Sequence, residues 1–261
     1  MSSPVDEYVL RGGIFVLLVV SLCLLERWQP RRTLSLPRRA RWPANLGIAL
    51  VNRVLLIPLS AIAAALVAER QGWGFFNQVS PPLWLATLAS LLLLDLTIYW
   101  QHRLFHRIPV LWRLHRMHHA DADVDVTTGV RFHPLEAVFS MLIKIAAVIA
   151  LGAPAATVLL FEIVLNATSL FNHANVRIPA TLERALRWVV VTPDMHRVHH
   201  SNDAVELAHN FGFNLPWWDR LFGTYLDQPA AGHESMQIGI AGFDTPQSQH
   251  FRSLLTHPFR N

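Results

Sequence analysis

Histidine is the residue type in this chain whose spacing points most directly to chemistry. Fourteen of the 261 residues are histidines. Three short clusters hold eight of them: His102 and His106; His115, His118 and His119; His196, His199 and His200. Residues three or four apart share a face of a helix, so each cluster would present its imidazoles in one direction. Eight neutral imidazoles can hold two metal ions with four ligands each, and such nitrogen-rich sites suit zinc, copper, iron or nickel.

The composition is that of a membrane protein. Hydrophobic residues make up 52% of the chain and charged residues only 15%, against about 25% in ordinary soluble domains. Positive charge comes almost entirely from arginines beside apolar segments, since Lys144 is the only lysine. This placement argues against nucleic-acid binding, which needs a basic surface stripe. The single cysteine, Cys23, lies in an apolar run, so a disulfide within the chain is excluded.

Apolar runs predict an all-α membrane bundle of four to five transmembrane helices. Residues 12–25 form a run that is short for a span, and a cleaved signal peptide is the less favoured alternative. Residues 46–68 and 83–94 follow, and the latter run leads directly into His102. A further block at 135–171 is interrupted by Gly152-Ala153-Pro154, which predicts a hairpin of two helices.

The arginine distribution predicts the topology. Six arginines between positions 27 and 41 indicate a cytoplasmic loop. Three crossings and the hairpin would then bring every histidine cluster to the cytoplasmic side, at the inner membrane if the source is bacterial. We expect one unit over 1–261: transmembrane helices in 1–101, the first two histidine clusters in 102–133, the hairpin in 134–172, and the third cluster with a cytoplasmic cap and tail in 173–261.

The predicted hairpin also places two charges opposite each other. Lys144 and Glu162 lie nine residues either side of Ala153, so antiparallel arms would bring them together. A lone charge at that depth is costly, which predicts an ion pair. The alternative is that Lys144 extends to the interface alone.

Seven sequence motifs carry a resemblance to a known family. They are Asp95, YWQHRLFH (99–106), LWRLHRMHH (111–119), RFHPLE (131–136), FNHAN (171–175), TPDMHRVHH (192–200), and NFG (210–212) with WDRLFGTY (218–225). With them the chain resembles the fatty acid hydroxylase superfamily, also called the sterol desaturase family, of membrane-embedded non-haem di-iron oxygenases. The resemblance implies two iron ions, O2 as co-substrate, and hydroxylation or desaturation of an unactivated C–H bond in a sterol or fatty acyl lipid.

The resemblance also implies roles for particular residues. The eight clustered histidines would be metal ligands and His173 the ninth, whereas His133 is either a tenth ligand or a support beside the ligands. Asn175 and Asn210 would support the ligands, and Asp95 would either accept a hydrogen bond from a ligand imidazole or be a structural buried carboxylate. Some family members have a further histidine where Arg177 stands, which leaves nine or ten ligands open. His209 is expected not to be a ligand.

Two further expectations concern partners and rival functions. Electrons would come from a separate donor, a ferredoxin or a cytochrome b5-like protein with its reductase. The rival function is a metal-binding membrane protein, a transporter or a sensor, without oxygenase activity. Transport would favour ligands along a path through the spans, whereas these histidines gather at one membrane edge.

Overall fold

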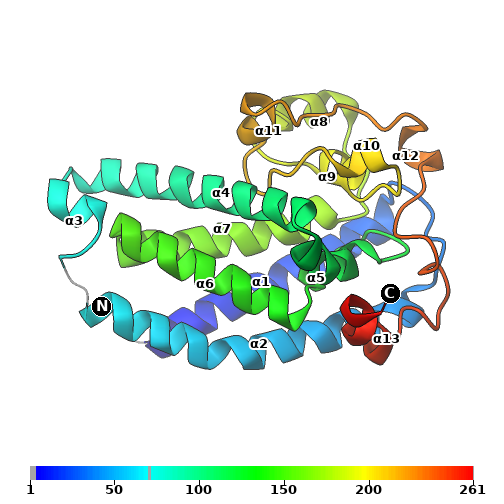
Figure 1. Cartoon of the computed structure of the whole chain (residues 1–261). Coiled ribbons are helices and arrows are strands. Elements are labelled where there is room, and N and C mark those ends of the chain that lie inside the picture. The colour runs from blue at the N-terminus through cyan, green and yellow to red at the C-terminus, as the bar shows by residue number, and fades with distance from the viewer. Residues whose placement is uncertain (1–3, 70–71, 261) are drawn as a thin grey trace.

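The computed structural model describes residues 4–69 and 72–260, and this part of the chain is all-helical, with two isolated β-bridges and no strand. Five long helices run side by side (Figure 1): α1 Pro4–Trp28, α2 Arg38–Glu69, α4 Leu83–Arg107, α6 Pro134–Leu151 and α7 Ala155–His173. Each contains a stretch long and apolar enough to cross a membrane. The predicted membrane bundle is therefore confirmed, with five candidate spans.

The first span is longer than the apolar run that predicted it. Helix α1 continues through Glu26 to Trp28, and its candidate span, Val9–Trp28, covers 20 residues. That length is sufficient to cross the hydrocarbon core of a bilayer. Glu26 is accommodated because its carboxylate is buried and accepts hydrogen bonds from the backbone N–H groups of Val126 and Asn175.

Local sequence signals set the ends of the hairpin helices. Helix α6 begins at Pro134, where a missing N–H costs nothing, and His133 caps it by accepting from the N–H of Leu135. It ends at Leu151 and is capped by Gly152, whose φ of 64° lies in the left-handed region that favours glycine. Pro154 then precedes α7. The predicted break at 152–154 is confirmed.

The path of the chain brings all the histidine clusters to one end of the bundle. Helices α1, α2 and α4 run in alternating directions, and α6 and α7 go out and back (Figure 1). The short helix α3, Phe75–Val79, lies at the end away from the clusters. The histidine-bearing end therefore lies opposite the N-terminus of α1.

The membrane bundle has a small interior and a broad apolar exterior. Leu94, Ile98, Val148 and Phe161 are buried between α4, α6 and α7. Only 11–28% of the residues in the five span windows are buried within the protein. The remaining apolar side chains face outward, as a lipid environment requires.

Short helices and loops form a cap over the histidine end (Figure 1). They are α5 Pro109–His119, η1 Thr128–Val130, α8 Ala180–Leu186, α9 Pro193–His199, α10 Ala204–Leu207, α11 Trp217–Leu221, α12 Gly232–Ser235, α13 Phe251–Thr256 and η2 His257–Phe259. The loop after α5 is anchored by Arg41 of α2, which is fully buried and pairs with Asp121 (2.8 Å) and Asp125. The cap is thereby fixed to the membrane helices.

The predicted pair between the hairpin arms is confirmed. Lys144 Nζ lies 2.7 Å from Glu162 Oε1. Arg11 of α1 donates to the other oxygen of Glu162, a contact that the sequence pattern did not indicate. The charges therefore join three helices rather than two.

Candidate metal centre

Nine buried or half-buried histidines meet where the membrane helices enter the cap. They form two groups, in each of which the ligand atoms lie within 4.8 Å of one another. The five-histidine group contains His102, His106, His115, His119 and His199, and the four-histidine group contains His118, His173, His196 and His200. His173 thus joins the eight clustered histidines.

The two H-x-x-H-H clusters divide their histidines between the groups in opposite ways. In α5 the first and last histidines, His115 and His119, join the five-histidine group, and His118 joins the other. In the third cluster, His196 and His200 join the four-histidine group, and His199 joins the other. Neighbouring helical residues point about 100° apart, so each cluster reaches both groups. Each H-x-x-H-H motif therefore contributes histidines to both groups.

Backbone carbonyls set the tautomer of four imidazoles. The Nδ1–H groups of these rings donate to carbonyl oxygens: His102 to Phe211 (2.8 Å), His199 to His209 (2.8 Å), His118 to Arg131 (3.1 Å) and His173 to Ser169 (2.7 Å). A neutral imidazole carries one proton. Each Nε2 atom is consequently a lone pair directed into its group.

These lone pairs face each other at short range. A metal ion bound between them would account for this arrangement. The Nε2 atoms of His102 and His199 lie 2.9 Å apart, and those of His118 and His173 lie 3.1 Å apart. Neither pair can share a hydrogen bond while both Nδ1 atoms hold the protons. Both ring nitrogens of His200 are also buried without a hydrogen-bond partner among the described residues. A cation in each group would satisfy these atoms.

Glu136 is a site residue that reasoning from the sequence missed. Its Oε1 lies 2.6 Å from Nδ1 of His115, and both side chains are buried. A carboxylate behind a metal-binding imidazole fixes the ring and makes it a stronger ligand. Its position three residues after His133, inside the RFHPLE motif, was the available signal.

Two residues that were predicted beside the ligands have other contacts. His133 caps α6, and its Nε2 faces the carbonyl oxygen of Leu255 at 3.3 Å, outside both histidine groups. Asp95 accepts hydrogen bonds from the indole of Trp218 (2.8 Å) and the N–H of Leu215 (3.3 Å). Of the two roles expected for Asp95, these contacts fit the structural buried carboxylate. They connect α4 to the cap.

Asn210 and Asn175 support the site through the backbone. Asn210 has a φ of 56°, and its side chain bonds the carbonyls of Met195 and Leu226. This conformation directs the carbonyls of its two neighbours, His209 and Phe211, to the imidazoles of His199 and His102. Asn175 bonds both the N–H and the carbonyl of Arg32, which helps to hold the 29–37 loop, whose Arg31 pairs with Asp194 of α9.

Burial keeps the clustered histidines of the cap neutral. Desolvation lowers the pKa of His118, His119, His196 and His200 well below 6.5, and it lowers the pKa of His199 to about 3. Metal binding requires the neutral imidazole. These rings are thus in the ligand state at physiological pH.

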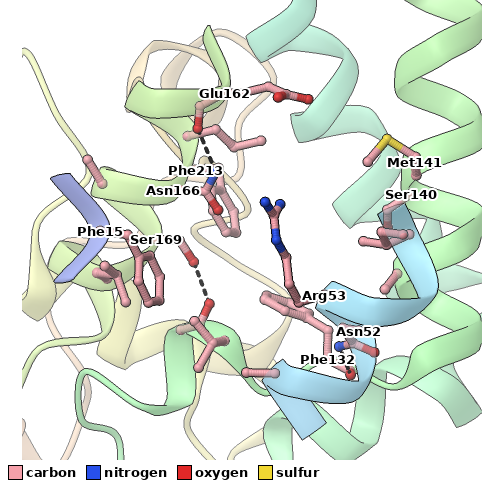
Figure 2. A pocket seen from close by; sticks show the side chains of 18 of the residues that line it. Phe15, Asn52, Arg53, Phe132, Ser140, Met141, Glu162, Asn166, Ser169 and Phe213 are labelled. Atoms are coloured by element: carbon pink, nitrogen blue, oxygen red, sulfur yellow. Dashed lines mark hydrogen bonds between the residues drawn. The ribbon is translucent and has the colours of Figure 1, made fainter. Parts of the chain in front are cut away.

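A cavity lies within the membrane bundle (Figure 2) and extends to two of the histidines, His102 and His115. Its volume is about 650 Å³, and its walls come from α1, α2, α4, α6 and α7. Apolar side chains such as Phe15, Phe132 and Phe213 line much of it, and His102, His115 and Glu136 lie at its cap end. A lipid chain in this cavity would reach the five-histidine group.

Comparison with known proteins identifies related sequences. The family model described as fatty acid hydroxylase matches residues 87–224. The chain is 32% identical over 178 residues to the ornithine lipid hydroxylase OlsE of Rhizobium tropici, covering 68% of this chain and 51% of that protein. It is 29% identical over 154 residues to the alkylglycerol monooxygenase of Xenopus tropicalis, covering 57% and 32%.

A more distant relative is the Delta(7)-sterol-C5(6)-desaturase of Nicotiana tabacum. It is 25% identical over 167 residues, covering 60% of this chain and 57% of that protein. The chain thus spans about half or less of the two more similar relatives described above. No solved structure matches significantly.

Proposed function

Because the chain belongs to the fatty acid hydroxylase family, we propose that it is a membrane-bound, O2-dependent di-iron oxidoreductase that hydroxylates or desaturates a lipid. The observation that carries this proposal is the placement of two adjoining histidine groups at one end of the bundle, with His102 and His115 of the five-histidine group in the wall of the cavity. The relatives act on lipids, as their names state.

The donor set supports a redox metal held by neutral nitrogen ligands. Imidazole suits several metals, including iron and zinc, but zinc has no redox chemistry. Oxidation of an unactivated C–H bond needs a redox centre, which the two iron ions would supply when bound. The nine histidines of the two groups would hold them, with five and four ligands.

The protein's own groups would orient the ligands and the lipid. Backbone carbonyls, three in the cap and one in α7, hold four Nδ1–H groups in place, and Glu136 holds His115. The apolar cavity admits a chain from the bilayer and excludes water from the reacting carbon. Electrons would come from a separate ferredoxin or cytochrome b5-like protein at the cap, which by the arginine distribution faces the cytoplasm.

The test measures metal and product together. Purified protein is expected to contain two iron ions per chain, and host membranes that contain it are expected to gain oxidised lipid detectable by mass spectrometry. His118→Ala removes one of four ligands from its group, so iron should fall to about one ion per chain with loss of activity. His250→Ala, an exposed histidine outside both groups, is the matched control.

Two results would contradict the proposal. Bound metal without any lipid oxidation, despite a working reductant, would favour the metal transporter or sensor. Full activity of His118→Ala would show that the four-histidine group is not part of the reaction centre.

A further inference from the structure

The C-terminal segment 243–260 packs against α2 and α5 at the histidine end of the molecule (Figure 1). It lies outside the residues that the fatty acid hydroxylase family model matches. Leu254 of α13 is fully buried and shares a hydrophobic cluster with Met117 of α5. Arg116 of α5 donates to two backbone carbonyl oxygens near the end of the segment, at 2.9 and 2.8 Å. Apolar contacts and hydrogen bonds therefore hold this segment to a helix that bears three of the clustered histidines.

Gln249 is the side chain by which this segment reaches the metal centre, and it is fully buried. Its Nε2 donates to the carbonyl oxygen of Phe243 within the segment and to that of Ala120 (2.8 Å). Ala120 directly follows His119 at the end of α5. The Oε1 of Gln249 accepts from Nη1 of Arg131 (2.6 Å). One amide therefore connects the end of α5 to the loop that precedes α6.

The loop that precedes α6 contacts the ring of His118 in two ways. The carbonyl oxygen of Arg131 accepts from Nδ1–H of His118 at 3.1 Å. The ring of Phe132 stacks on the same imidazole, with 4.5 Å between the ring centroids. On the other side of Phe132, Nε2 of His133 faces the carbonyl oxygen of Leu255 at 3.3 Å. The C-terminal segment thus contacts this loop both before and after Phe132, and the orientation of His118 depends on the loop.

We propose that Gln249 is a positioning residue for the four-histidine group, acting through Arg131 on His118. The carbonyl that holds Nδ1–H directs Nε2 of His118 into that group. A loop without this tether would hold the imidazole in several orientations, and the ordering that binding then requires would weaken the metal. The loss should fall on the four-histidine group, to which His118 belongs. This inference rests on the proposed function only in taking the two groups as metal sites, and it needs no turnover.

The experiment measures the affinity of each metal ion without turnover. Chelator-treated protein is titrated with Co²⁺ against a competing chelator, and its visible absorption reports each ion as it binds. Gln249→Met keeps the length of the side chain but removes both hydrogen bonds. One of two bound ions should therefore bind about tenfold more weakly, with an altered absorption spectrum, while the other binds as before. Gln249→Glu keeps an acceptor for Arg131, so it should restore much of the affinity and the original spectrum.

The matched control is Gln247→Met, because Gln247 is an exposed glutamine of the same segment. Its Co²⁺ titration should match that of the unaltered protein. Adding Gln249→Met to His118→Ala identifies the route: a residue that acts through His118 should leave the remaining ion unchanged to within about twofold. The proposal is overturned if Gln249→Met leaves both ions unchanged, or if it weakens both equally, as a general loss of stability would.

A measurement on the unaltered protein decides the case in which Gln249→Met does not fold. Coupling between two sites is reciprocal, so bound Co²⁺ should slow amide hydrogen exchange in residues 247–257. Exchange in α8, which contributes no histidine to either group, should not change. Equal exchange in residues 247–257 with and without Co²⁺ would overturn the proposal. Protein that binds no Co²⁺ would overturn the proposed function as well, whereas two ions that are insensitive to Gln249 would overturn this inference alone.

Discussion

The chemistry of the centre depends on the way single imidazoles are oriented. Nine histidines alone would form a buried, repulsive cluster of nitrogen lone pairs. Carbonyl oxygens from the turn at Asn210 and from the loop before α6 fix the tautomers of His102, His118 and His199. The residues that hold the ligands are thus as much a part of the site as the ligands.

Glu136 should tune metal affinity through His115. Glu136→Gln keeps the shape but removes the negative charge, so we expect metal affinity to fall by about tenfold to a hundredfold. Competition with a chelator measures this. The exposed carboxylate Glu234 provides the matched control, Glu234→Gln. Superimposable titrations of Glu136→Gln and the unaltered protein would show that the carboxylate only fills a buried space.

Acid should destabilise the metal-free protein. The folded-state pKa of His199 is about 3, and those of His118 and His200 lie well below 6.5. A histidine with a lowered folded-state pKa contributes stability above pH 6.5, and this stability is lost as the pH falls toward the folded value. Each such residue contributes up to about 1.4 kcal/mol per pH unit. Thermal unfolding of chelator-treated protein should therefore occur at lower temperature at pH 5 than at pH 8. An unchanged Tm would contradict the burial of neutral rings.

At the scale of elements, three membrane helices are joined by charge. Lys144→Glu alone places two carboxylates together, and Glu162→Lys alone places three cations together, so both should lower expression. The double exchange re-forms one pair but leaves Arg11 facing a cation at position 162, so recovery should be partial. Adding Arg11→Glu should complete it. Membrane yield measures the series, and a double variant no better than either single one would contradict the pairing.

Elements defined by local signals were the predictable part of the fold. Run length and the Gly152–Pro154 break predicted the spans and the hairpin, and symmetry about Ala153 predicted the Lys144–Glu162 pair. Arg11 could not be predicted, because its contact depends on how α1 packs against α7. Helical spacing likewise brought His115, His118 and His119 to one side of α5.

The separation into two groups could not be predicted, because it depends on tertiary packing: one group combines histidines of α4, α5 and α9, and the other combines histidines of α5, α7 and α9 with His200. For Asp95 the sequence left two roles open, beside the ligands or structural, and only packing shows that its carboxylate accepts from Trp218. Glu136 was missed for the same reason: its partner, His115, lies on another helix.

For the whole molecule, the five candidate spans would place the start of α1 and the cap on opposite sides of a membrane. The arginine-rich 27–41 segment predicts that the cap side is cytoplasmic. A fluorescent protein fused after Asn261 should then fluoresce, and alkaline phosphatase fused at the N-terminus should be active in a bacterial host. The reverse pattern would place the centre outside and exclude a cytoplasmic electron donor.

The uneven distribution of ligands along the chain has a consequence for biosynthesis. Four of the five histidines in one group lie between His102 and His119, whereas three of the four in the other group come later: His173 at the end of α7, then His196 and His200. The first group is nearly complete when the ribosome reaches α6. The second cannot assemble until both hairpin arms have been inserted and α9 has been synthesised. Metal acquisition would therefore occur in two stages, and the second ion would mark a fully translated and inserted chain.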